Sequence, residues 1–341
     1  MFTTRLPTSA TPFIGRAEEL AEIALLLADS TCRLLTLIGP GGIGKTRLAL
    51  EVARSLTFPN CIYFVSLQPL TSPELVVPAI ADALQFQFYS GGEPQQQLLD
   101  YLREKSLLLL LDNFEHLLDG VTSLSDMLAA APFVKLLVTS RERLNLREEW
   151  LFEVQGLSFP TSETEANFET YDAVQLFVQH ARRTHSSFIL TDRRKPAVAR
   201  ICRLLGGMPL GVELAASWVR SLPCGQIADE IEHSLEILET SVHNMPLRHR
   251  NMRAVFTPTW ERLSAVEQDV FMKLSVFRGG FTTEAAGAAF LSPLARDGRT
   301  HPVDRSGGFL HIGKRTERAP LFEFSALRRQ LLAHTIKRVL T

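Results

Sequence analysis

The sequence predicts an α/β protein in which a parallel sheet carries helices on both faces, followed by a mainly helical part. Two observations support this prediction. Up to about residue 160, short apolar runs alternate with amphipathic segments, which is typical of parallel strands joined by helices. From Tyr171 onward, helical patterns follow one another and no strand signal of similar strength recurs for about a hundred residues.

The strands are expected where apolar runs are too short for a helix and end in glycine or polar residues. These runs are 33–38, 61–67, 107–113 and 134–141, with 151–157 as a candidate fifth strand. In parallel sheets, ligands bind at the carboxyl ends of the strands. The polar residues at those ends are Gly39 and its successors, Asp112, and Thr139 to Arg141.

The first helix is expected over 16–28, where Leu20, Ile23 and Leu27 recur at helical spacing. Glu18 and Glu19 in its first turn favour the helix dipole. The other helices expected beside the sheet are 73–86, 94–104 and 115–130. After a polar linker near 160–170, helices are expected at 172–183, 197–207, 209–222 and 224–238, and a further group begins near 248 with a capping box at Ser264 and Glu267.

Composition excludes several classes of protein. The 341 residues are 45% hydrophobic and 21% charged, as in soluble globular proteins. The apolar runs fall short of the roughly 18 residues that a spanning helix needs, and no secretory signal is recognisable, so we expect a cytoplasmic protein without a membrane partner. Four scattered cysteines predict reduced thiols, and the dispersed histidines do not suggest zinc.

Charge is distributed unevenly along a chain whose net charge is -1. Residues 291–341 carry ten Lys and Arg against four Asp and Glu. A basic segment of this kind is compatible with nucleic-acid binding and equally with an ordinary solvated face.

The stretch GPGGIGKT at 39–46 matches the phosphate-loop pattern in full, with Gly39, Gly44, Lys45 and Thr46 at the defining positions. Glycines let successive N–H groups point at one anion, and the helix that follows adds its positive dipole end. Lys45 is expected to reach the β and γ phosphates of ATP, and Thr46 to ligate Mg²⁺. The alternative is a structural glycine-rich turn. The residues expected to contact ATP or ADP here are Gly39, Gly41, Gly42, Ile43, Gly44, Lys45, Thr46 and Arg47.

Asp112 ends a wholly apolar strand, where a carboxylate is costly unless it is paired. Magnesium is the expected partner, and capping of a helix near Glu115 is the alternative. The next residue is Asn113, and an amide can position water but is a poor base. Glu115 is the nearest carboxylate and could act as a base or lie at the surface. Slow hydrolysis is therefore predicted.

Arg141 ends the fourth strand, in the sequence VTSR. If this strand lies beside the phosphate-loop strand, its guanidinium could contact the γ phosphate and distinguish ATP from ADP. The alternative is a surface ion pair with Glu142 or Glu148.

Six segments in order resemble the signal-transduction ATPases with numerous domains, in their NB-ARC-like bacterial branch, which often belong to transcriptional regulators of the LuxR and streptomycete antibiotic-regulator type. The segments are FIGRAEEL, GPGGIGKT, LLLLLDNFEHLLD, KLLVTSRERL, GGMPLGVELAA and RHRNMRAVFTPTWERLSAVEQDVFMKLSVFRGGF. The resemblance runs from about Pro12 to Phe290.

The resemblance implies an N-terminal arm at 1–11, a P-loop NTPase domain at 12–160, a helical domain at 161–245 and a winged-helix-like domain with a basic C-terminal segment at 246–341. It also implies that Pro209 touches the nucleotide and that one stretch lines the adenine side, namely Phe13, Ile14, Gly15 and Arg16. The family usually has an acidic pair that locks the ADP state, where this chain has Ser325 and Ala326. The chain then stops at Thr341, which suggests a truncated or degenerate switch core, or a chain whose last fifty residues are partly scrambled relative to the family.

The predicted function is a slow ATP- and ADP-dependent signalling switch at the core of a transcriptional regulator. ATP-dependent self-association and DNA contact through a partner or a missing module are its expected interactions. A DNA-handling ATPase of the origin-recognition kind is the alternative, and a small-molecule kinase is a third reading, for which no acceptor site is recognisable.

Overall fold

The computed structural model describes residues 6–8, 11–59, 61–162 and 167–238, and nine scattered positions between 251 and 269. Apart from these nine positions, the predicted winged-helix region lies outside the described residues, as do Ser264 and Glu267 of the capping box and Ser325 and Ala326. The chain divides into two compact units. The first takes in the residues up to Ser158 together with Glu169–Leu176 and Met208–Leu210.

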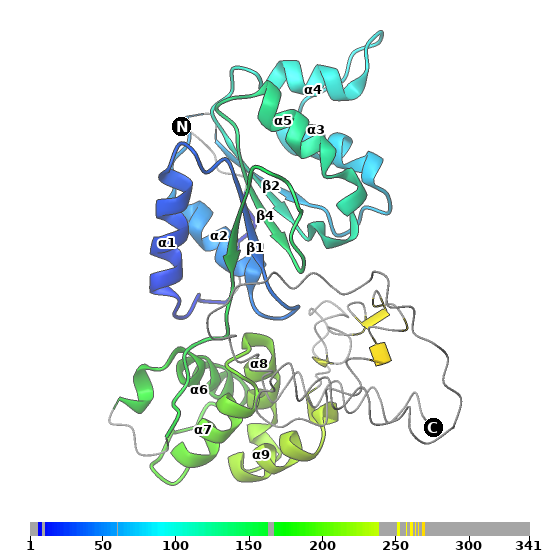
Figure 1. Ribbon diagram of the computed structural model, residues 1–341. Helices are drawn as coiled ribbons and strands as arrows, with labels where there is room; N and C mark the ends of the chain where they lie inside the picture. The colour runs from blue at the N-terminus through cyan, green and yellow to red at the C-terminus, as the bar shows by residue number, and fades with distance from the viewer. Residues whose placement is uncertain are drawn as a thin grey trace, which may run out of the picture. The chain divides into compact units, whose positions relative to one another are not determined.

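The first unit is built on a sheet of five parallel strands, which confirms the predicted fold class of the N-terminal half (Figure 1). The strand order is β2-β3-β4-β1-β5. The strands are β1 (Leu34–Ile38), β2 (Ile62–Ser66), β3 (Leu108–Asp112), β4 (Lys135–Ser140) and β5 (Glu149–Glu153). Strand β5 starts and ends a few residues earlier than the expected 151–157.

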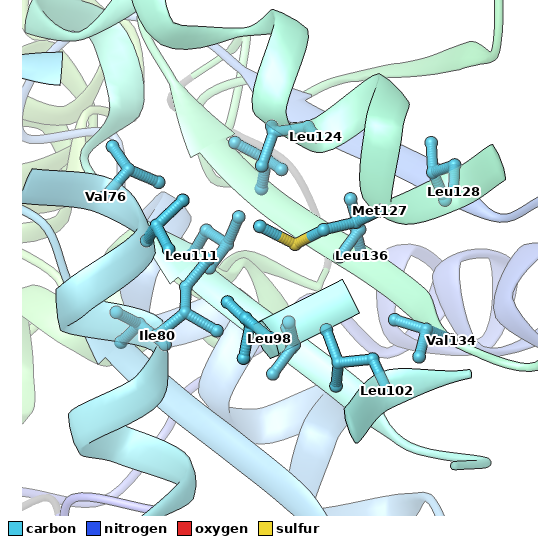
Figure 2. Packing of buried hydrophobic residues seen from close by; sticks show 14 of the residues in the cluster. Val76, Ile80, Leu98, Leu102, Leu111, Leu124, Met127, Leu128, Val134 and Leu136 are labelled. Atoms are coloured by element: carbon cyan, nitrogen blue, oxygen red, sulfur yellow. The ribbon is translucent and has the colours of Figure 1, made fainter. Parts of the chain in front are cut away.

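Helices cover the sheet on both faces (Figure 1). Helices α1 (Ala17–Ala28) and α2 (Lys45–Ser55) lie on one side, and α3 (Val76–Leu84), α4 (Pro94–Leu102) and α5 (Thr122–Ala130) lie on the other. Leu108 to Leu111 of β3 are all inaccessible to solvent, because each face of the strand is covered. Figure 2 shows Leu111 and Leu136 packed among side chains of α3, α4 and α5, with which they form a buried hydrophobic cluster.

The predicted helix over 115–130 is wrong in its first half. Two 3-10 helices, Phe114–His116 and Leu118–Gly120, precede α5, which begins only at Thr122. Phe114 and Leu117 are buried in the core three positions apart, a spacing that suits 3-10 turns. Gly120 also passes so close to Pro73 that an added Cβ would lie 2.9 Å from the Pro73 Cβ.

The segment 73–86 likewise opens with a 3-10 helix, Pro73–Leu75, before α3. Helix α3 then ends at Leu84, because Gln85 adopts a left-handed conformation with φ 56°.

Four helices lie wholly or mostly in the second unit, in the segments where helices are expected from the sequence. They are α6 (Asp172–Thr184), α7 (Lys195–Leu204), α8 (Pro209–Ser217) and α9 (Cys224–His233). Short 3-10 helices follow α8 at Trp218–Arg220 and α9 at Leu235–Ile237. Arg200 of α7 pairs with Asp229 and Glu232 of α9 and joins these helices. Within the described part of the chain, every helix is too short or too polar to span a bilayer.

Candidate functional site: a phosphate loop beside a buried aspartate

The loop between β1 and α2 has the backbone that an anion cradle requires. Gly42 and Gly44 have φ values of 77° and 96°, which side chains with a Cβ rarely adopt. Helix α2 begins directly at Lys45, so its N-terminal amides and dipole face the loop. The Lys45 Nζ donates to the carbonyls of Gly39 at 2.7 Å and Pro40 at 3.1 Å. The lysine therefore folds back along the loop that it is predicted to serve.

Asp112 lies at the carboxyl end of β3 and is 4% exposed. Its Oδ1 accepts hydrogen bonds from the Thr46 hydroxyl at 2.6 Å and from the Thr139 hydroxyl at 2.7 Å. Thr139 belongs to β4, which lies between β3, the strand that ends in Asp112, and β1, the strand that precedes the phosphate loop. The structure thus brings together the two residues that the sequence assigned to magnesium. The Asp112 Oδ1 faces Thr46 and Thr139. The alternative interpretation of the sequence was that this carboxylate caps the helix that follows.

The oxygen donors of Thr46 and Asp112 suit Mg²⁺, a hard cation that takes one or two protein oxygens and completes its shell with phosphate and water. No group of three or more His, Cys, Asp or Glu side chains placed to hold a metal occurs among the described residues. This donor set therefore fits a metal that arrives with a phosphate ligand, because the protein supplies only part of the coordination shell.

Glu115 and Arg141 form an ion pair, with the Arg141 Nε 3.0 Å from the Glu115 Oε1. The side chains are 6% and 13% exposed, so neither lies at the surface. Strand β4 lies beside β1, which was the condition for Arg141 to reach a phosphate. The sequence singled out both residues but did not foresee their contact, because they are 26 positions apart.

Asn113, directly after Asp112, adopts a left-handed conformation with φ 74°. Its N–H donates to the Thr139 hydroxyl at 3.0 Å. Thr139 therefore holds both the carboxylate and the backbone that follows it. The sequence marked Thr139 as polar at a strand end but assigned it no role.

The predicted adenine-side stretch, Phe13 to Arg16, lies against the phosphate loop and α2. The Arg16 guanidinium donates to the carbonyls of Ile43 at 2.8 Å and Gln155 at 2.9 Å. Burial lowers the pKa of Arg16, and the nearby Glu19 and Asp172 carboxylates partly offset this. This guanidinium is thus engaged by protein carbonyls in addition to any role toward a base.

Arg47 of α2 binds the backbone of Thr11 and Pro12, just before this stretch. Its Nη2 donates to the carbonyls of Thr11 at 3.0 Å and Pro12 at 2.8 Å, and its guanidinium lies 5.9 Å from the centre of the Phe13 ring. Ile14 is half-buried beside Phe13.

Pro209 and Leu210 also lie against the loop. The Leu210 N–H donates to the Gly42 carbonyl at 3.2 Å, and a Cβ added to Gly44 would lie 3.8 Å from Pro209 Cγ. Pro209 therefore lies at the phosphate loop, within the first unit. The contacts of Leu210 with Gly42 and of Asp172 with Arg16 were missed, because nothing local in the sequence distinguishes these two residues from ordinary first-turn residues of a helix.

Comparison with known proteins agrees with this geometry. A family model described as an AAA domain matches residues 28–146. The "Putative HTH-type transcriptional regulator Rv0890c" of Mycobacterium tuberculosis is 34% identical over 287 residues, which cover 82% of this chain and 31% of that protein. The chain thus spans about a third of the length of this relative.

In two further comparisons, this chain covers a larger share of the matched protein. The "Uncharacterized protein Rv0894" of M. tuberculosis is 32% identical over 281 residues, which cover 82% of this chain and 68% of that protein. The Walker-type ATPase PABY2304 of Pyrococcus abyssi has a TM-score of 0.53 at 15% identity, covering 89% of this chain and 90% of that chain. This second likeness shows a shared fold.

Proposed function

The chain belongs to the family of the "Uncharacterized protein Rv0894" of M. tuberculosis, and from this premise and its phosphate site we propose that it binds ATP and ADP with Mg²⁺ as a slow nucleotide-dependent switch. The contact that carries the proposal is the 2.6 Å hydrogen bond between Thr46 and Asp112, beside a complete phosphate loop. Thr46 and Asp112 would hold magnesium, which would supply positive charge to neutralise the phosphates. Lys45 would exchange its loop carbonyls for phosphate oxygens.

Slow turnover is proposed because the residue directly after Asp112 is not a carboxylate. Asn113 is an amide, and Glu115 accepts a hydrogen bond from Arg141. Opening of this ion pair would free the Glu115 carboxylate to act as a base. The same opening would free Arg141 to contact a γ phosphate, so the ion pair supports a role for Arg141 in distinguishing ATP from ADP.

The order of motifs, the AAA-domain match and the name of one relative support the finer proposal of a signal-transduction ATPase with numerous domains, in its NB-ARC-like branch, acting within a transcriptional regulator. A DNA-handling ATPase that binds DNA through a winged helix is the second candidate, supported by the basic segment 291–341. DNA affinity that falls steeply with salt would favour this second candidate. ATP-dependent association, measured by sedimentation with ATP and with ADP, would favour the switch.

The test is nucleotide retention and binding. Purified protein is denatured and the released nucleotide is identified by chromatography, after which ATP and ADP affinities are measured by calorimetry. Lys45→Ala should weaken binding by about 10- to 100-fold, because it removes a charge-assisted contact. Lys195→Ala is the matched control, since that lysine lies on α7 and pairs with Asp192. Equal affinities of the wild type and Lys45→Ala would overturn the proposal.

A further inference from the structure

The carboxylate of Asp172, the first residue of α6, is seated on the turn formed by Gly15 and Arg16. Its Oδ2 accepts the Arg16 N–H at 3.2 Å. A Cβ added to Gly15 would lie 2.1 Å from Asp172 Cγ, so only glycine leaves room for the carboxylate. Gly15 and Arg16 have φ values of 69° and 61°, and the left-handed conformation, which glycine adopts freely, is unfavourable for Arg16 without a partner that holds it.

Asp172 is itself held in place within the first unit. Its N–H donates to the Ser158 hydroxyl at 3.0 Å, and the Ala173 N–H donates to the Ser158 carbonyl, also at 3.0 Å. The first turn of α6 is thus fixed to the segment that follows β5.

From the turn, the contact continues to the phosphate loop. The Arg16 side chain is buried and donates to the Ile43 carbonyl at 2.8 Å. The Ile43–Gly44 peptide is planar and trans, so its C=O and N–H point in opposite directions. Directing the Ile43 carbonyl at Arg16 therefore directs the Gly44 N–H away from it. Gly44 is a defining glycine of the phosphate loop, where backbone N–H groups are the anion donors.

We propose that Asp172 is a positioning residue for the phosphate loop, which acts through Arg16 to orient the Ile43–Gly44 peptide, so that docking of the first turn of α6 sets the affinity for the phosphate ligand. The inference rests on the proposed function for the identity of that ligand. It makes α6 a regulator of the site, because any signal that displaces this turn loosens the loop.

The first test follows hydrogen exchange of the peptide covering residues 39–46 in nucleotide-free protein. Asp172→Ala should raise the exchange rate of these amides severalfold, whereas Asp172→Asn keeps an acceptor oxygen and should restore most of the protection. Asp192→Ala is the matched control, because Asp192 is 94% exposed and pairs only locally with Lys195. Unchanged exchange in Asp172→Ala would overturn the proposal.

The second test is a double-substitution cycle on ATP affinity. Arg16→Ala removes the guanidinium but keeps the N–H that Asp172 accepts. Asp172→Ala should weaken binding about tenfold in the wild type and have little further effect in Arg16→Ala. Additive losses would show that Asp172 does not act through Arg16.

Two further comparisons keep the inference separate from the proposed function. If Asp172→Ala does not fold, Gly15→Ala displaces the carboxylate from the other side and should reproduce the faster exchange. If the wild type binds no nucleotide while exchange still rises in the Asp172 variant, the proposed function fails and the positioning role stands. If the wild type binds nucleotide and the variant matches it in both assays, the positioning role fails alone.

Discussion

Thr139→Val should destabilise the first unit, because the hydroxyl that it removes serves two partners. Thr139 is 1% exposed, donates to Asp112 and accepts from the Asn113 N–H. A hydrogen bond to a charged group contributes about 1.5–3 kcal/mol, and a buried donor left without a partner costs about 1–3 kcal/mol. Asn113 is only half-buried, so the lower part of that second range applies. The free energy of unfolding should fall by about 2–4 kcal/mol.

Thr36→Val is a matched control in the neighbouring strand. Thr36 is inaccessible to solvent, pairs in register with Val138, and its Oγ1 finds no hydrogen-bond partner among the described residues. A buried hydroxyl without a partner costs about 1–3 kcal/mol, and valine has nearly the same shape. The same chemical change should therefore be neutral or stabilising by about 1 kcal/mol in this strand.

The assay is urea unfolding followed by far-ultraviolet circular dichroism. With a slope of about 2–3 kcal/mol per M for a unit of this size, the Thr139→Val midpoint should fall by about 1 M, and the Thr36→Val midpoint should stay or rise. A Thr139→Val midpoint equal to or above that of Thr36→Val would refute the assignment of the two hydrogen bonds to the Thr139 hydroxyl.

Three other predictions follow from the same geometry. Glu115→Gln alone or Arg141→Gln alone should lower the free energy of unfolding by about 3 kcal/mol, because each leaves the other charge mostly buried. The double substitution should cost less than the sum of the two single losses, and additive losses in urea midpoints would contradict the ion pair. Gly42→Ala should weaken ATP binding at least about tenfold, because φ at this position is 77° and the new Cβ would lie 3.1 Å from Leu210. Calorimetry measures the ATP affinity, and an unchanged value would exclude a role for the Gly42 backbone in binding. Burial raises the pKa of Cys202 to about 12, so iodoacetamide at pH 8 should leave this thiol unmodified in the folded protein, as mass spectrometry can show. The free energy of unfolding should fall as pH rises above about 9, because there only the thiol of the unfolded chain ionises. Urea midpoints at pH 8 and pH 10 test this second expectation.

The five strands and the phosphate loop could be predicted from the sequence because each depends on a local pattern. Runs such as Leu107 to Leu111 are apolar throughout only where both faces of a strand are covered. The glycines and Lys45 are constrained by chemistry within a single turn. The segment 115–130 was mistaken for one helix because the insertion of Phe114 and Leu117 into the core depends on residues far away in the chain.

The sequence by itself determined the α/β class, the order of the motifs and the residue types at the strand ends, since these follow from periodicity and short-range chemistry. Only the tertiary structure decided which polar groups meet. The strand order places β4 between β3 and β1, and this gives Asp112 its contact with Thr139. In the same way, the pairing of Glu115 with Arg141 and the seating of Asp172 on Gly15 depend on where separate segments pack, because a side chain selects its partner by position in space.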